Sequence, residues 1–166
     1  MPLSPLPQDR RKQISDHPSA ALNDFKNLMR QGKQTHNQHN YQSACSYFRR
    51  ALSLVKQLID LRPLKGHQHY LTLKIAATHN LSLSFSALGQ LGNAEDILKD
   101  LHQSLLRICL APAVPKPLRI TALGALDNSL FSLTSNLGLQ GKVDQLYRVI
   151  SETDHVAELT ATQILH

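Results

Sequence analysis

The chain has 166 residues, of which 42% are hydrophobic and 18% are charged. That length fits one domain, and the composition has too many apolar and too few charged residues for a disordered protein. No apolar run approaches the roughly 18 residues that a transmembrane helix needs, and the first charged residues follow a short apolar part broken by prolines, the reverse of a secretory signal. We therefore predict a cytoplasmic protein that does not contact membranes.

The formal net charge of +6 is distributed unevenly along the chain. Residues 1–83 carry 12 Lys and Arg against 4 Asp and Glu, a net charge of +8, whereas the remainder carries 6 against 8, a net charge of −2. Such an asymmetry favours an acidic partner for the N-terminal half. It is equally consistent with charges that serve solubility alone.

Apolar residues recur at spacings of three and four along most of the chain, which is the pattern of amphipathic helices. Residues 1–18 are rich in proline and charge and lack this period, so we predict a flexible leader there and an N-cap at Ser19. The sixth helix either continues unbroken to about residue 161 or is broken at 151–154, and we favour the unbroken form. The predicted helices cover residues 19–38, 41–62, 67–90, 93–110, 117–138 and a last segment from about 142.

The chain also repeats itself about every 50 residues. Ala44 and Ala94 are 50 positions apart, and the glycine-containing turns at Gly89 and Gly138 are 49 apart. Periods of this length indicate stacked structural units. We predict a single all-α domain over 19–166, built from three long antiparallel helical hairpins at about 19–66, 67–116 and 117–166.

The spacing of small and aromatic residues resembles that of a tetratricopeptide repeat. The first unit carries the pattern in Gly32, Tyr41, Ala44, Phe48 and Ala51. The second unit, from Asn80-Leu81 to Ala94-Glu95, is similar to the long repeats of kinesin light chains, and the third unit is the least similar. The resemblance implies a right-handed stack of hairpins, a tetratricopeptide-like α–α superhelix. Because the usual unit has 34 residues, each helix here should be about two turns longer.

In the resembled family, the first helix of each hairpin lines a concave groove that binds extended peptides or partner helices. Asn80 is the strongest candidate, because its family counterpart hydrogen-bonds the ligand backbone and an amide both donates and accepts. The alternative is a solvated helix face on which Asn80 stabilises a neighbouring helix. The groove residues that the resemblance implies are Lys26, Arg30, Lys33, His36, His79, Asn80, Asn128, Ser129 and Ser132, and the same groove face would include Met29, Ala76, Leu83 and Asn136.

The cations among these residues give the groove its predicted chemistry. Lys26, Arg30 and Lys33 recur at spacings of four and three on one helix face, so they would act together on a carboxylate. We therefore predict a protein or peptide partner of acidic character. The end faces of a three-unit stack are apolar and need to be covered, which leaves a homodimer open.

Catalytic and metal sites are not expected. Acidic residues are few, and Glu95, Asp96 and Asp100 are expected on exposed faces. The histidine pairs at 36/39 and 67/69 have no nearby Cys, Asp or Glu to complete four ligands, so we predict solvated turn histidines and no metal or cofactor. Cys45 and Cys109 lie on apolar stripes, which predicts buried reduced thiols.

Nucleic acid is the rival partner class. The pI is about 9.6, and cations cluster at 10–12, at Arg49 and Arg50, and at Lys56, where they would attract phosphate. Aromatic residues make up only 5% of the chain, too few for an evident stacking platform. We predict a non-catalytic protein- or peptide-binding adaptor, with a nucleic-acid-associated helical-repeat regulator as the alternative.

Overall fold

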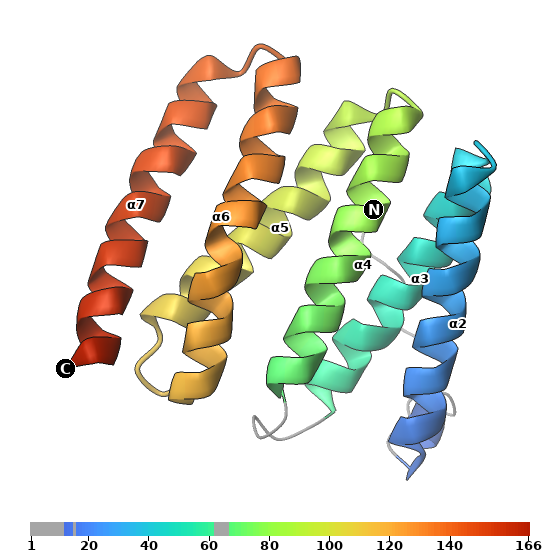
Figure 1. The fold of residues 1–166 in the computed structure, drawn as a ribbon, viewed down its shortest axis with the longest axis horizontal. Helices are drawn as coiled ribbons and strands as arrows, with labels where there is room; N and C mark the ends of the chain where they lie inside the picture. The colour runs from blue at the N-terminus through green and yellow to red at the C-terminus, as the bar shows by residue number, and fades with distance from the viewer. Residues whose placement is uncertain (1–11, 15, 62–66) are drawn as a thin grey trace. The chain divides into compact units, whose positions relative to one another are not determined.

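The computed structural model describes residues 12–14, 16–61 and 67–166, and all the regular structure in these ranges is helical. The all-α prediction is therefore confirmed, whereas the stacking of three hairpins stays a prediction. The helices begin and end close to the predicted residues, and α7 passes through 151–154 without a break, as predicted. The helices, labelled in Figure 1, are α2 (Pro18–Asn37), α3 (Tyr41–Asp60), α4 (His67–Ala87), α5 (Leu91–Leu110), α6 (Lys116–Leu139) and α7 (Val143–Leu165).

The start of α2 differs from the prediction. His17 is its N-cap and Pro18 its first residue, so the N-cap predicted at Ser19 is wrong. Proline fits the first helical position because its φ is already helical and its missing N–H would have no intrahelical partner there. Most of the predicted flexible leader, residues 1–11 and 15, lies outside the described residues. Residues 12–14 are helical and Ile14 is buried, so this part is not the irregular segment that we predicted.

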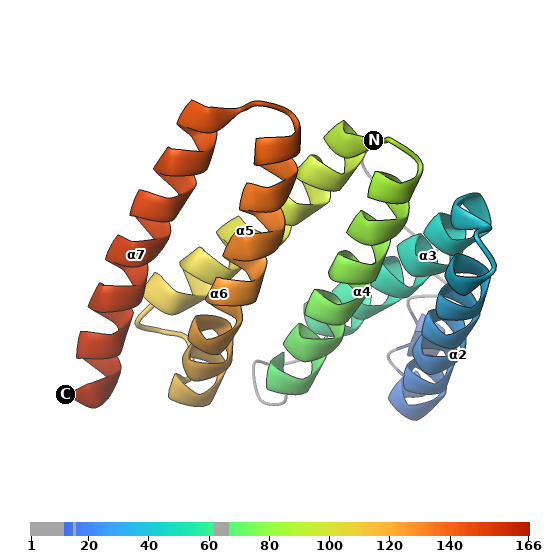
Figure 2. The same cartoon turned by 45° about the horizontal axis from the view of Figure 1, so that its top comes forward.

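The chain divides into two compact units, Met1–Leu88 and Gly89–His166. The division falls between α4 and α5, inside the second predicted hairpin. In unit 1, α2 and α4 run in the same direction, and both pack on α3. Figures 1 and 2 show this arrangement from two directions. In unit 2, α6 and α7 form an antiparallel pair, and both contact α5.

The close approach of α2 and α3 depends on a glycine. A Cβ built on Gly32 would lie 2.5 Å from Cε1 of Phe48, closer than real Cβ contacts come. Phe48 is 1% exposed, and the neighbouring Ala44 and Ala51 are fully buried. The small residues of the predicted repeat signature therefore let the two helix backbones approach each other around the Phe48 ring.

The same turn ends α2, α4 and α6. His39, Gly89 and Gly141 have positive φ values of 61°, 71° and 69°. Each follows the end of its helix, where a left-handed residue commonly reverses the chain. Their spacing of 50 and 52 residues carries the sequence repeat into the backbone conformation.

Polar contacts add to the core in both units. In unit 1 the guanidinium carbon of Arg49 lies 5.0 Å from the centre of the Phe85 ring, which joins α3 to α4. In unit 2 Arg119 of α6 donates from Nε to the carbonyl oxygen of Cys109 at 2.9 Å. Cys45 and Cys109 are buried free thiols, as predicted, and burial raises the pKa of each thiol above its usual value.

Candidate functional site

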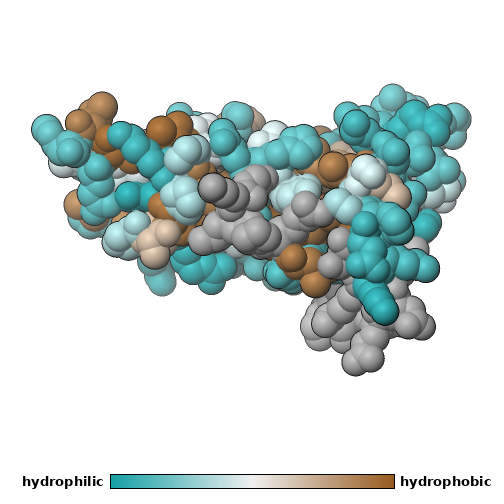
Figure 3. All heavy atoms as spheres, turned by 90° about the horizontal axis from the view of Figure 1, so that it is seen from below, coloured by the Kyte–Doolittle hydropathy of each residue, from teal (hydrophilic) through white to brown (hydrophobic). Residues whose placement is uncertain are grey.

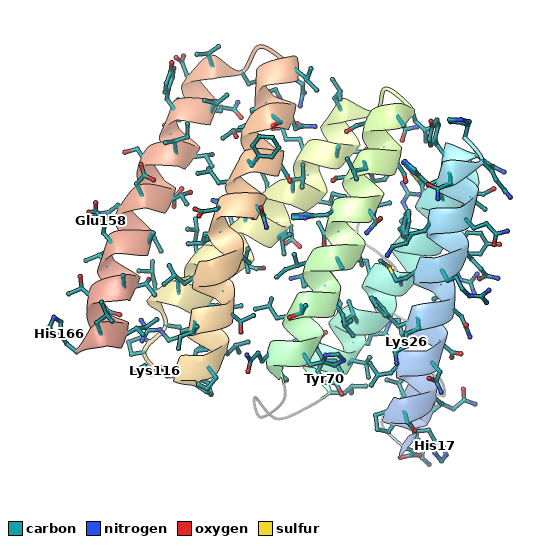
Figure 4. All side chains as sticks on the ribbon, viewed as in Figure 1. His17, Lys26, Tyr70, Lys116, Glu158 and His166 are labelled. Carbon is teal, nitrogen blue, oxygen red and sulfur yellow. The ribbon has the colours of Figure 1, made fainter. Side chains whose placement is uncertain are left out.

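The predicted cations form a row on α2 in unit 1. Lys26, Arg30 and Lys33 are all exposed, and none of them forms an ion pair with another described residue. Figure 4 labels Lys26, which lies on the flank of α2 that faces α4. The three side chains are therefore exposed, and we call the exposed face that they share with α4 the α2–α4 face.

His36 and Asn80 lie on the same face, connected through Ser84. His36 Nδ1 is 2.9 Å from Ser84 Oγ, and that hydroxyl is 3.1 Å from the carbonyl oxygen of Asn80. The side chain of Asn80 donates from Nδ2 to the carbonyl oxygen of Ala76 at 2.8 Å. A primary amide has two donors and one acceptor oxygen, and within the described residues the Oδ1 and the second N–H of Asn80 form no other side-chain hydrogen bond. The structure therefore brings these two predicted residues together.

His79 is also predicted in the groove, and it is half-buried on α4. Its Nε2 is buried and has no hydrogen-bond partner within the described residues. Burial lowers the pKa of its imidazole, because a desolvated environment disfavours the charged form. A neutral His79 would therefore add no positive charge to the α2–α4 face. Leu83, one helical turn further along α4, is 61% exposed.

The predicted residues of α6 lie in unit 2, and one of the three is not available to a ligand. Asn128 is exposed, and the half-buried Ser132 donates to its carbonyl oxygen at 3.0 Å. Ser129 is fully buried, so its assignment to the groove is wrong. The physical reason is a hydrogen bond to His102 of α5, whose Nδ1 is 2.9 Å from the serine Oγ.

Two further residues that were expected on the groove face, Asn136 and Met29, are buried, so their assignment to the groove is also wrong. Asn136 donates from Nδ2 to the carbonyl oxygen of Leu91 at 3.0 Å, which ties α6 to the first residue of α5. Met29 is 7% exposed, because it lies on the same side of α2 as the buried Phe25 and Gly32. Fewer of the predicted groove residues are therefore exposed than the resemblance implied.

The sequence prediction missed a buried polar network around His102. Its Nε2 is 2.8 Å from Thr153 Oγ1 of α7, and the threonine hydroxyl donates to the carbonyl oxygen of Val149 at 2.6 Å. Because the threonine hydroxyl proton is donated to Val149, Thr153 Oγ1 accepts a hydrogen bond from His102 Nε2–H. Nδ1 then carries no proton and accepts from Ser129. Every polar atom of the neutral imidazole therefore has a partner, and protonation would place a second N–H against Ser129.

This network predicts a loss of stability in mild acid. Burial lowers the pKa of His102 in the folded protein below 6.5, its usual value in an unfolded chain. Between the folded-state and unfolded-state pKa values, the unfolded chain therefore binds a proton that the folded chain does not. The free energy of unfolding is therefore not reduced by His102 above about pH 6.5, and it falls as the pH drops below that value. The free energy of unfolding in urea should differ less between about pH 7.5 and about pH 5 for His102→Gln than for the wild type. His155→Gln, an exposed control on α7, should keep the full difference; equal pH dependence in all three proteins would contradict the prediction.

Glu95 was expected on an exposed face, and the structure shows that it is buried. Lys99, Lys142 and Gln140 all donate to its carboxylate. Burial by itself would raise its pKa, but the hydrogen bonds from Lys142, Lys99 and Gln140 outweigh burial and lower the pKa to about 2. The ion pair with Lys142 connects α5 to the residue that precedes α7, so this carboxylate has a structural role in unit 2.

The structure shows the surroundings of His39 and His67, one member of each predicted histidine pair. Within the described ranges, no group of three or more His, Cys, Asp and Glu side chains is arranged to hold a metal ion. His39 Nδ1 is 2.8 Å from the Tyr41 hydroxyl. His67 is buried, so the prediction of a solvated side chain is wrong for this residue; it shares the buried side of α4 with Tyr70 and Leu71.

Comparison with known proteins gives a family. The sequence matches the family described as "Protein of unknown function (DUF2753)" over residues 23–166. The chain belongs to the DUF2753 family. That match includes all of α3 to α7 and most of α2. No curated protein and no solved structure matches the chain. None of the helices described in this DUF2753 protein is both long enough and apolar enough to cross a membrane.

Proposed function

We propose that this DUF2753 protein is a cytoplasmic, non-catalytic adaptor that binds an acidic segment of another protein on the α2–α4 face of unit 1. The observation that carries the proposal is the row of Lys26, Arg30 and Lys33, three exposed cations on one helix that form no ion pair with any residue the structure describes. Asn80 and the exposed Leu83 on α4 add an amide and an apolar contact to the same face. Cations, an amide and an apolar side chain together suit a peptide that has both carboxylates and hydrophobic residues.

A tetratricopeptide-like architecture is part of the proposal. The three hairpins would be α2–α3, α4–α5 and α6–α7. Two observations support it, namely the close approach at Gly32 and Phe48 and the left-handed turn residues His39, Gly89 and Gly141 at intervals of about 50 residues. In the resembled family the first helix of each hairpin contributes to the binding site, so the proposal includes Asn128 and Ser132 of α6.

The test is a charge-matched comparison of two triple variants. Lys26→Ala/Arg30→Ala/Lys33→Ala removes the row on α2. Arg107→Ala/Lys116→Ala/Arg148→Ala removes three exposed cations from unit 2 and changes the net charge equally. Binding of a fluorescent Glu-rich peptide should weaken at least about 10-fold for the first variant, which corresponds to about 1.4 kcal/mol. The second variant should bind within about 3-fold of the wild type.

Two outcomes would contradict the proposal. Equal weakening in both triple variants would mean that the peptide responds to net charge alone. Tighter binding of a single-stranded oligonucleotide than of the peptide, with a steep decrease on adding salt, would favour the nucleic-acid alternative, because each neutralised phosphate contributes to that slope.

A further inference from the structure

A groove with a volume of about 760 Å³ lies between α2 and α3 in unit 1. One flank of each helix forms a wall, and Ile14, which precedes α2, also lines the groove. Figure 3 shows mainly hydrophilic side chains at the surface of this part of unit 1, at the right of the view. The polar wall residues are Asp24, Asn27 and Gln31 on α2, and Arg50, Ser53 and Gln57 on α3. We call this surface the α2–α3 groove.

The α2–α3 groove is separate from the α2–α4 face. The groove flank of α2 contains Asp24 and Gln31. At 3.6 residues per turn, the buried Phe25, Met29 and Gly32 lie between that flank and the cation row. The two surfaces are therefore on opposite flanks of the same helix.

Amide side chains provide most of the polar groups of the groove. Gln57 donates from Nε2 to Ser53 Oγ at 3.3 Å, whereas its Oε1 is buried and has no hydrogen-bond partner among the described residues. An unpaired buried oxygen is costly, and rotation of this side chain toward the groove would pair the oxygen with a donor on a ligand. Asn27 and Gln31 on the other wall are exposed. Because each amide both donates and accepts, the walls suit a ligand with alternating N–H and C=O groups, which is the backbone of an extended peptide.

The two walls carry opposite charges. Asp24 on α2 and Arg50 on α3 are both exposed, and neither forms an ion pair with a residue that the structure describes. α2 and α3 run antiparallel, with Gly32 against the Phe48 ring. Arg50 is therefore level with residues 28–30 of α2, which lie about 6–9 Å along the helix axis from Asp24. A ligand in the groove meets an anion on one wall and a cation on the other.

We propose that the α2–α3 groove binds an extended peptide segment in which a basic and an acidic residue are three positions apart. Side chains of an extended chain alternate between its two sides, so residues at an odd spacing point to opposite walls. A spacing of three covers about 10 Å, close to the separation of Asp24 and Arg50 along the groove. The basic residue then pairs with Asp24 and the acidic residue with Arg50. This proposal does not depend on what the α2–α4 face binds.

Two peptides of equal composition test the spacing of the charges. Acetylated and amidated Ala-Lys-Ser-Thr-Glu-Ala has its charged residues three apart, and Ala-Lys-Ser-Glu-Thr-Ala has them two apart. Titration followed by NMR of the labelled protein should give a dissociation constant below about 1 mM for the first peptide. The second should bind at least about 3-fold more weakly, because one of its charged side chains points to the wrong wall. Equal affinities, or no saturable binding of the first peptide, would overturn the proposal.

Variants of the two charged residues test the site itself. Asp24→Asn and Arg50→Gln should each weaken binding of the first peptide at least about 3-fold and abolish its preference over the second. Asp144→Asn and Arg148→Gln change the net charge equally at exposed positions on α7, and both should bind the two peptides like the wild type. A preference that survives in both groove variants, or that disappears in the α7 controls, would refute the groove as the site.

The α2–α4 face can be tested separately with the same two peptides. Neither peptide carries a net charge, so neither should respond to the removal of surface cations elsewhere. The Lys26→Ala/Arg30→Ala/Lys33→Ala variant should therefore bind both peptides within about 2-fold of the wild type. If this variant instead loses the preference for the first peptide, the peptide binds on the α2–α4 face and the groove proposal is wrong.

Discussion

Replacing Gly32 by alanine is expected to lower the free energy of unfolding by about 2 kcal/mol or more. The new Cβ would lie 2.5 Å from Cε1 and 2.8 Å from Cδ1 and Cζ of Phe48. The ring is 1% exposed and lies beside the fully buried Ala44 and Ala51, so it cannot move without displacing α3. Urea unfolding followed by circular dichroism measures the change. A loss of less than about 0.5 kcal/mol would show that α2 and α3 do not approach each other as described.

Two further variants separate the steric effect from helix propensity. Gly124→Ala in α6 adds a Cβ that meets no atom within 4 Å, so it should stabilise the protein by about 1 kcal/mol through helix propensity alone. Gly32→Ala combined with Phe48→Leu should be less destabilised than the sum of the two single variants, because the smaller side chain leaves room for the new methyl group. Additive losses would point to a cause other than this contact.

Replacing Glu95 by glutamine is the second change with a large expected effect, about 2 kcal/mol of stability near neutral pH. The carboxylate is 4% exposed and accepts hydrogen bonds from Lys99, Lys142 and Gln140. Glutamine keeps the shape but has only one acceptor oxygen and no charge. The two lysine side chains are 37% and 36% exposed, so water replaces part of what they lose and limits the cost.

The effect of Glu95→Gln should depend on pH in a defined direction. The folded-state pKa of Glu95, about 2, lies below its usual 4.5. Its contribution is therefore complete above about pH 4.5 and is lost as the pH falls toward about 2. The difference in unfolding free energy between wild type and variant should shrink over that interval. Asp96→Asn, an exposed neighbour, should cost less than about 0.5 kcal/mol at any pH; a larger loss for it than for Glu95→Gln would contradict the assignment.

Local chemistry explains why the helices were predictable from the sequence. Apolar spacings of three and four, and turns such as those at Gly89 and Gly141, depend only on residues close together in the chain. The bounds of α3 to α7 therefore agree with their predicted ranges within a few residues. The exposure of Lys26, Arg30 and Lys33 was predictable for the same reason, since these residues lie away from the apolar stripe of their own helix. The acidic ligand and the three-hairpin stack stay predictions.

What the sequence by itself determined is the helical class, the helix bounds and the cationic face of α2, because each follows from the order of residues within a few turns. Only the tertiary structure decided which polar residues are buried. His102 meets Ser129 and Thr153 from 27 and 51 positions away, and Glu95 meets Lys142 from 47 positions away. The residue pattern of a single helix does not decide whether a polar side chain at the edge of its apolar stripe is solvated or buried. A partner on another helix decides between the two, since burial without one is costly.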